Sequence, residues 1–257
     1  MPPYPMAASA VVAPVLAGAP RPVRVVARTA QAAYLATGDP RLPALCLAGS
    51  DAVRLPCAVV VGPGTPVPAG AAGSVGLGRL AVGAFTARMG RWWRPPVLPR
   101  LARVSSDRLA ACAASLATCL LDRPGGDNAD RLAAALRTGE PPERVVRALL
   151  GCGPGLTPLG DDVLAGALVT LLARGAAAAG PLGAAATALA PARTTFVSAA
   201  LLRHAARGEC VPQLAAVLAA VGRDEPLDRP LTALLTVGHT SGSGLGHGVR
   251  VGLGAAL

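Results

Sequence analysis

A loop rich in glycine and proline runs directly into an apolar stretch in the second half of this chain. The loop reads Gly-Pro-Gly-Leu-Thr-Pro-Leu-Gly-Asp-Asp over residues 153–162, and the apolar stretch extends from Val163 to Ala173. A helix start offers unpaired backbone N–H groups and a positive dipole end, which together favour an anion. The pattern therefore predicts a buried helix whose first turn carries polar groups available for binding or chemistry.

A second loop of the same kind lies near the C-terminus, over residues 238–244. It reads Gly-His-Thr-Ser-Gly-Ser-Gly and combines hydroxyl groups with glycine amides. We expect the two loops to form one shared site. His239 could act there as a general acid or base, because the pKa of a free imidazole lies near neutrality. A structural role for this histidine is the alternative.

Two adjacent carboxylates, Asp161 and Asp162, stand at the start of the predicted buried helix. Asp161 could simply cap that helix. Two aspartates exceed what a cap needs, and because neighbours on a helix point about 100° apart, one can cap while the other faces a cavity. We take Asp161, Asp162 and His239 as the candidate catalytic residues. Two carboxylates are an incomplete ligand set for Mg²⁺, so no metal is predicted.

Polar side chains also cluster at the start of a later helical segment, where Arg193 precedes Thr194, Thr195 and Ser198. Hydroxyls at such positions often only bond their own backbone, whereas an arginine beside hydroxyls can also hold a carboxylate or a phosphate. The predicted substrate-binding residues offer a backbone N–H, a hydroxyl or a guanidinium group. They are Gly155, Thr157, Gly160, Arg193, Thr194, Ser198, Thr240, Ser241 and Gly242.

The formal net charge of +10 at pH 7 invites a nucleic-acid function. All 24 basic residues are arginines scattered along the chain, and one local cluster, from Arg88 to Arg100, surrounds Trp92 and Trp93. Basic residues interleaved with aromatic ones can bind single-stranded nucleic acid. We favour the competing interpretation, two tryptophans at a domain junction with solvated or ion-paired arginines, and expect no nucleic-acid partner.

The chain shows no sign of membrane insertion or secretion. The apolar stretch from Val163 to Ala173 has 11 residues, whereas a membrane span needs about 20. Residues 1–20 contain no lysine or arginine, unlike the basic start of a secretory signal. The six cysteines lack metal-ligand spacing, which is typical of free thiols in a reducing compartment, and Cys152 has no base nearby in sequence that would make it a nucleophile. We therefore expect a cytoplasmic protein with no membrane partner.

Short β-favouring runs separated by turn residues occupy the first hundred residues, at 23–27, 44–48, 58–61 and 74–83. They indicate a small antiparallel β-domain, barrel-like or sandwich-like, over residues 1–102. From Ser105 onward the apolar residues recur at helical spacing, which indicates an all-helical domain over residues 103–257. We therefore predict an α+β chain. The expected helices lie at 105–121, 127–138, 141–150, 162–173, 194–207, 211–221, 227–235 and from the second loop to 251.

Three stretches, taken together, resemble a bacterial family typified by AllH, a subunit of oxamate carbamoyltransferase. They are GPGLTPLGDDVLAG over 153–166, TTFVSAALLRHAARG over 194–208 and GHTSG over 238–242. The first is long and specific, and the resemblance covers roughly residues 151–248. Where the family often has a Trp-Asp pair after Thr-Ser-Gly, this chain has Ser243 and Gly244.

The resemblance implies a role in allantoin degradation, in which oxalurate and phosphate exchange with oxamate and carbamoyl phosphate with the help of companion subunits. Such small anionic metabolites suit amide-lined helix ends and an arginine, and carbamoyl transfer calls for donors aimed at a developing oxyanion. The resemblance indicates no bound organic cofactor. A second function stays open, a non-catalytic subunit that binds a metabolite or stabilises a complex, because no pair of nucleophile and base is evident.

Overall fold

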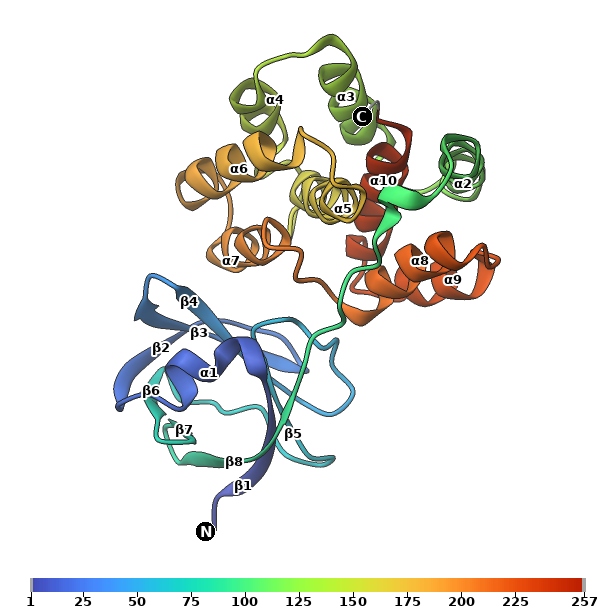
Figure 1. Cartoon of the computed structure of the whole chain (residues 1–257). Coiled ribbons are helices and arrows are strands. Elements are labelled where there is room, and N and C mark those ends of the chain that lie inside the picture. Colours follow the sequence, from blue (N-terminus) through green and yellow to red (C-terminus); the bar gives the residue numbers. More distant parts are fainter. Residues whose placement is uncertain (1, 256–257) are drawn as a thin grey trace. The chain divides into compact units, whose positions relative to one another are not determined.

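The computed structural model describes residues 2–255. Contacts divide the chain into two compact units, Met1–Pro95 and Pro96–Leu257. The first unit is a closed β-barrel, and the described part of the second, up to residue 255, contains helices and no strand (Figure 1). The predicted α+β class, with strands before helices, is confirmed. In the described residues, no helix is long and apolar enough to cross a membrane.

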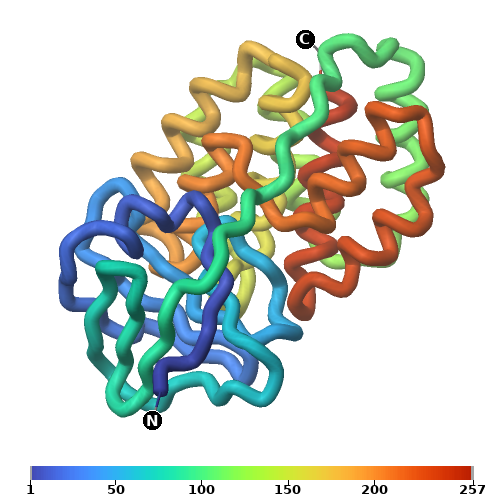
Figure 2. Tube along the Cα trace, turned by 60° about the horizontal axis from the view of Figure 1, so that its bottom comes forward, coloured from blue at the N-terminus to red at the C-terminus, as the bar shows by residue number. Residues whose placement is uncertain are grey.

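Eight strands close the barrel in the order β1-β5-β4-β3-β2-β6-β7-β8. Most neighbours are antiparallel, as predicted, but β1 pairs with β8 and β4 pairs with β5 in parallel. The pairing of the first strand with the last closes the barrel, and both views show these two strands side by side (Figures 1 and 2). The strands are β1 Tyr4–Ser9, β2 Arg21–Arg28, β3 Ala32–Asp39, β4 Leu42–Ala48, β5 Ala58–Val61, β6 Ala72–Gly76, β7 Arg79–Val82 and β8 Phe85–Trp93.

The barrel has its own apolar core, to which Leu35, Leu45, Leu47 and Leu80 contribute fully buried side chains. A 3-10 turn (Ala10–Val12) and the short helix α1 (Ala13–Leu16) follow β1. The predicted strand at 58–61 is confirmed, whereas the run at 74–83 is a hairpin of β6 and β7. Strands β1, β3 and β8 were not predicted, because alanine, proline or arginine dilutes their β-favouring residues and pairing with neighbours decides their conformation.

Nine helices follow the barrel within the described residues. They are α2 Ser106–Cys119, α3 Gly126–Thr138, α4 Pro142–Leu149, α5 Leu159–Arg174, α6 Ala179–Arg193, α7 Phe196–Ala205, α8 Pro212–Arg223, α9 Asp228–Leu235 and α10 Ser241–Gly254. All eight predicted helices exist with shifted ends. The sequence did not predict α6, since its glycine and proline content reads as a loop, although α6 packs against α4 and α7.

Helix α5 lies at the centre of the helical unit, and α10 packs along it (Figure 1). Two glycines make the close approach possible. A Cβ atom on Gly248 of α10 would lie 2.3 Å from the carbonyl oxygen of Val163, and one on Gly166 of α5 would lie 2.3 Å from that of Leu245. The two helices therefore touch through their backbones.

Replacing Gly248 with alanine should force α5 and α10 apart. Because the new methyl group would meet a carbonyl oxygen and not a flexible side chain, we expect a loss of about 1–3 kcal/mol in the free energy of unfolding. Urea denaturation measures this loss. Gly180→Ala on α6 is the matched control, since nothing lies within 4 Å of its added methyl group. Equal stability of the two variants would contradict the close crossing.

Candidate functional site

The two glycine-rich loops lie side by side at the N-terminal ends of α5 and α10. The hydroxyl oxygens of Thr157 and Ser241 are 2.8 Å apart, so a hydrogen bond joins the loops directly. The carboxyl group of Asp162 lies beside both hydroxyls. A Cβ atom on Gly244 would be 2.7 Å from Cβ of Asp162, which shows how closely the first turns of the two helices meet. The structure thus brings together Thr157, Asp162 and Ser241, as the shared-site hypothesis requires.

The start of α5 is set by Pro158, which occupies the cap position, so the helix begins three residues earlier than predicted. The N–H of Gly160 donates to the carbonyl of Cys152, and the N–H of Asp161 donates to that of Pro158. These two amides of the helix start are therefore occupied. Within the described part of the chain, the N–H groups of Gly153, Gly155, Leu156, Thr157 and Leu159 have no hydrogen-bond partner, and all but the last belong to the preceding loop.

Asp161 is fully buried and accepts three hydrogen bonds. The donors are the N–H of Gly151 at 2.9 Å, the hydroxyl of Ser198 at 2.6 Å and the hydroxyl of Thr194. The carboxylate therefore ties the start of α7 to the loop before α5. It does not cap α5 with its side chain, and two of the predicted substrate-binding hydroxyls, those of Thr194 and Ser198, are directed at it.

The start of α7 is fixed to the first loop by a second contact. Thr195 caps α7, where its hydroxyl accepts from the N–H of Ser198 at 3.0 Å, and the same hydroxyl donates to the carbonyl of Leu156. The sequence groups Thr195 with Arg193, Thr194 and Ser198 and leaves open whether it bonds the backbone or a ligand; the structure shows that it bonds the backbone. Its position three residues before a helical serine is the signal that identifies it.

Asp162 has a different environment from its neighbour. Its side chain is 7% exposed, and its Oδ2 atom has no hydrogen-bond partner among the described residues. Burial raises the pKa of its carboxyl group to about 7, and the negative charge of Asp161 raises it to a smaller extent. The Ser241 and Thr157 hydroxyls act in the opposite direction and lower this pKa. Asp162 is therefore a buried carboxyl group that can hold a proton near neutral pH.

Within the described residues, no side chain of the other predicted site residues named below forms a hydrogen bond with Thr157, Asp162 or Ser241. Arg193 is exposed at the end of α6, and His239 is exposed in the second loop; no hydrogen bond or ion pair joins either side chain to another described residue. Gly155 is exposed with a positive φ of 96°, and Thr240 occupies the cap position of α10 without capping through its side chain. Gly242 packs its backbone against the carbonyl of Leu234. Of these residues, Gly155, His239, Thr240 and Gly242 lie within two positions of Thr157 or Ser241 in the sequence, whereas Arg193 does not.

Two buried polar residues of α10, Ser243 and His247, face a different loop. The hydroxyl of Ser243 donates to the carbonyl of Pro124 at 2.7 Å, and Nε2 of His247 lies 3.2 Å from the carbonyl of Arg123. Burial lowers the pKa of His247, and its Nδ1 atom has no hydrogen-bond partner in residues 2–255. These side chains anchor α10 to the segment before α3.

The cysteines and acidic residues add little chemistry to the site. All six cysteines are free, as expected, and the thiol of Cys152 lies 3.1 Å from the carbonyl of Ala148. Cys119, near the end of α2, is exposed, because the buried stripe continues from Leu116 to Leu120. In the part of the chain that the structure describes, no three His, Cys, Asp or Glu side chains cluster as metal ligands.

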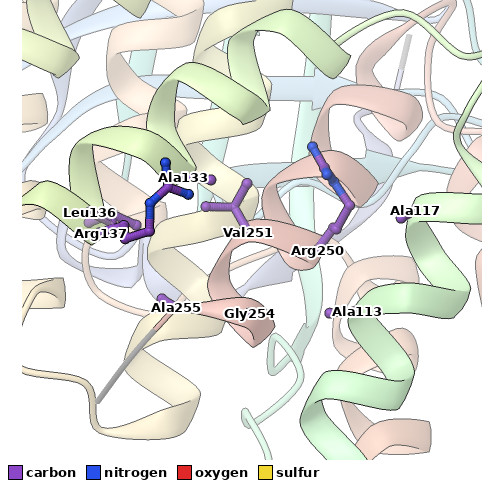
Figure 3. Close-up of a pocket in the computed structure, with 9 residues that line it drawn as sticks. All are labelled: Ala113, Ala117, Ala133, Leu136, Arg137, Arg250, Val251, Gly254 and Ala255. Atoms are coloured by element: carbon purple, nitrogen blue, oxygen red, sulfur yellow. The ribbon is translucent and has the colours of Figure 1, made fainter.

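A groove of about 450 Å³ lies elsewhere in the helical unit, between α2, α3 and α10 (Figure 3). Its lining is mostly alanine and glycine, with Arg137 and Arg250 on either side of Val251. Arg250 is already paired with Asp130 at 2.6 Å. None of the predicted site residues lines this groove, so it is separate from the junction of the two loops.

Replacing Asp162 with asparagine should stabilise the protein at high pH. The carboxyl group titrates at about 7 in the folded chain and at its ordinary 3.8 when unfolded, so the folded state loses stability as the pH rises between these values. We expect the free energy of unfolding of Asp162→Asn to exceed that of the wild type by about 2–4 kcal/mol above about pH 8. Near pH 4 the two proteins should have nearly the same free energy of unfolding. Urea denaturation across this pH range measures the difference. A gain that does not depend on pH would contradict the raised pKa.

Replacing Asp161 with alanine should have the opposite effect on stability. Three donors would lose their acceptor, so we expect the free energy of unfolding to fall by about 2–4 kcal/mol. Thermal or urea denaturation tests this. Asp107→Ala on α2 is the control, because Asp107 is also in the first turn of a helix but is exposed, and it should change stability by at most about 0.5 kcal/mol.

Comparison with known proteins gives a match in the second unit only. Residues 149–253 match the model of the family described as oxamate carbamoyltransferase subunit AllH. No curated protein and no solved structure matches the chain. The matched segment contains all three stretches on which the resemblance was based, together with α5, α7 and α10. The match confirms the resemblance: over residues 149–253 the chain is similar to the AllH family of oxamate carbamoyltransferase subunits.

Proposed function

We propose that this protein is a subunit of a carbamoyltransferase-like enzyme that acts on small anionic substrates of the oxamate, oxalurate and carbamoyl phosphate type. The observation that carries the proposal is the hydrogen bond between Thr157 and Ser241, which joins the two loops at the ends of α5 and α10 beside Asp162. The similarity of residues 149–253 to the AllH family supports the reaction class. The family description also supports companion subunits as partners.

The donors at the junction suit a small anion. Two helices of 16 and 14 residues begin there, so the positive ends of both helix dipoles meet. The N–H groups of residues 155–157 supply hydrogen-bond donors, and so does one of the hydroxyls of Thr157 and Ser241, because their mutual hydrogen bond uses the proton of the other. These groups bind a carboxylate or a phosphate without a buried cation.

The same donors suit the transfer step. When a nucleophile attacks a carbamoyl carbon, negative charge develops on the carbamoyl oxygen. Hydrogen-bond donors already fixed in a partly buried site stabilise that charge most where it forms. In this proposal the amides of residues 155–157 and the Thr157 hydroxyl serve as these donors. The Thr195 hydroxyl holds the Leu156 carbonyl, and Asp161 joins Gly151 to the start of α7.

A second candidate function is a non-catalytic subunit that binds a metabolite or stabilises the assembly. Two observations favour it. His239 is exposed without a partner, and the Cys152 thiol contacts a backbone carbonyl with no base beside it. The junction therefore lacks a nucleophile activated by a base among the described residues.

Turnover by the assembled enzyme separates the two functions. The complex with its companion subunits should convert oxalurate and phosphate to oxamate and carbamoyl phosphate. Thr157→Val removes one donor and should lower kcat/KM by about 100-fold with no change in assembly. The matched control is Thr232→Val on α9, whose hydroxyl bonds the carbonyl of Asp228 at 2.8 Å at the surface, and which should leave kcat/KM within about 2-fold.

The outcomes differ for each function. A complex that shows no carbamoyl transfer would rule out the first proposal. If the complex turns over but Thr157→Val has normal kcat/KM, while omission of this chain prevents assembly, the non-catalytic function holds.

A further inference from the structure

One oxygen of the candidate site has no partner in the structure. Oδ2 of Asp162 is buried and makes no hydrogen bond with any described residue. If the carboxyl group is ionised, this oxygen lacks a donor; if it is protonated there, the new O–H lacks an acceptor. A buried polar group without a partner costs about 1–3 kcal/mol, so a ligand that supplies the missing partner gains binding free energy.

The charges around Asp162 decide which partner is missing. Within the described residues, the charged side chain set against it is Asp161, which is on the same helix and is fully buried. Helix α10 presents the Ser241 hydroxyl and the backbone of Gly244, and the first loop presents the Thr157 hydroxyl; none of these carries a charge. In residues 2–255, no arginine or histidine forms an ion pair with either aspartate.

Two ionised carboxylates and a bound anion would place three negative charges together with only dipoles opposing them. Loss of the charge on Asp162 removes one of the three, and burial already favours its neutral form. Its proton would then need an acceptor, which an anionic oxygen supplies.

We infer that the site binds its anion together with one proton, which Asp162 holds on Oδ2 and donates to the ligand in a hydrogen bond. When the anion binds, an ionised Asp162 takes up one proton from solvent, and the resulting neutral Asp162 forms a hydrogen bond to the anion. This inference rests on the proposed anion site and adds the form in which the ligand binds. It predicts that the site takes ligands with an exposed anionic oxygen, and that binding weakens as the pH rises.

The test is the affinity of the full chain, with its companion subunits, for oxamate as a function of pH. Oxamate is a suitable probe because its carboxylate stays ionised over the whole range. With the carboxyl group of Asp162 titrating at about 7, we expect the dissociation constant to rise by about 100-fold from about pH 6 to about pH 9. Calorimetry in two buffers of different ionisation enthalpy should show uptake of about one proton per anion near pH 8.

Two variants make the result specific. Asp162→Asn has a neutral donor at every pH, so it should bind oxamate with a dissociation constant that changes by less than about 3-fold over the same range. Asp107→Asn removes an exposed carboxylate from the first turn of α2 and should keep the pH dependence of the wild type.

Three results would overturn the inference: oxamate binding that does not depend on pH, the same pH dependence in Asp162→Asn as in the wild type, or no binding at any pH. The failure of the proposed function has a different readout. Proton-coupled binding of oxamate by a complex without carbamoyl transfer would leave this inference standing and remove the enzymatic proposal.

Discussion

The backbone contact between α5 and α10 is the constraint on which the candidate site depends. Because glycine stands at positions 166 and 248, the two helices approach until each meets a carbonyl oxygen of the other. This approach brings their first turns together, with Gly244 directly against Asp162. The hydrogen bond between Thr157 and Ser241 forms only because of that approach. A larger side chain at the crossing would separate the two loops before it disturbed either loop itself.

The two adjacent aspartates show how helix geometry divides one motif into two roles. Consecutive residues point about 100° apart, so Asp161 faces α7 and the Gly151 amide, whereas Asp162 faces α10. Three donors satisfy the first carboxylate, and one oxygen of the second is left without a partner. Asp161 therefore fixes the start of α7 against Gly151, and Asp162 is the group whose protonation state the proposed ligand would change.

Local sequence signals predicted helices and strands whose own residues favour those conformations. They did not predict features that depend on tertiary contacts. The helical spacing from Ser105 onward predicted α2, which Ser105 caps, and the predicted run at 58–61 is β5. Helix α6 was missed because its glycine and proline residues are tolerated only by packing against α4 and α7. In the site, the motif predicted that the loops would meet, but not that Thr194 and Ser198 would bond Asp161, since that contact joins residues more than 30 positions apart.

The proposed anion site uses uncharged donors at the junction, without an arginine or a lysine beside Asp162 among the described residues. The chain has 24 basic residues, all arginine, yet none is set against Asp162 in the described residues. An arginine there would pair with the aspartates and hold Asp162 ionised, which would remove the proton that can be donated. Without the cation, burial keeps the carboxyl group near its titration point. The predicted loss of stability when Asp162 ionises at high pH and the proposed dependence of anion binding on a proton therefore have the same physical origin.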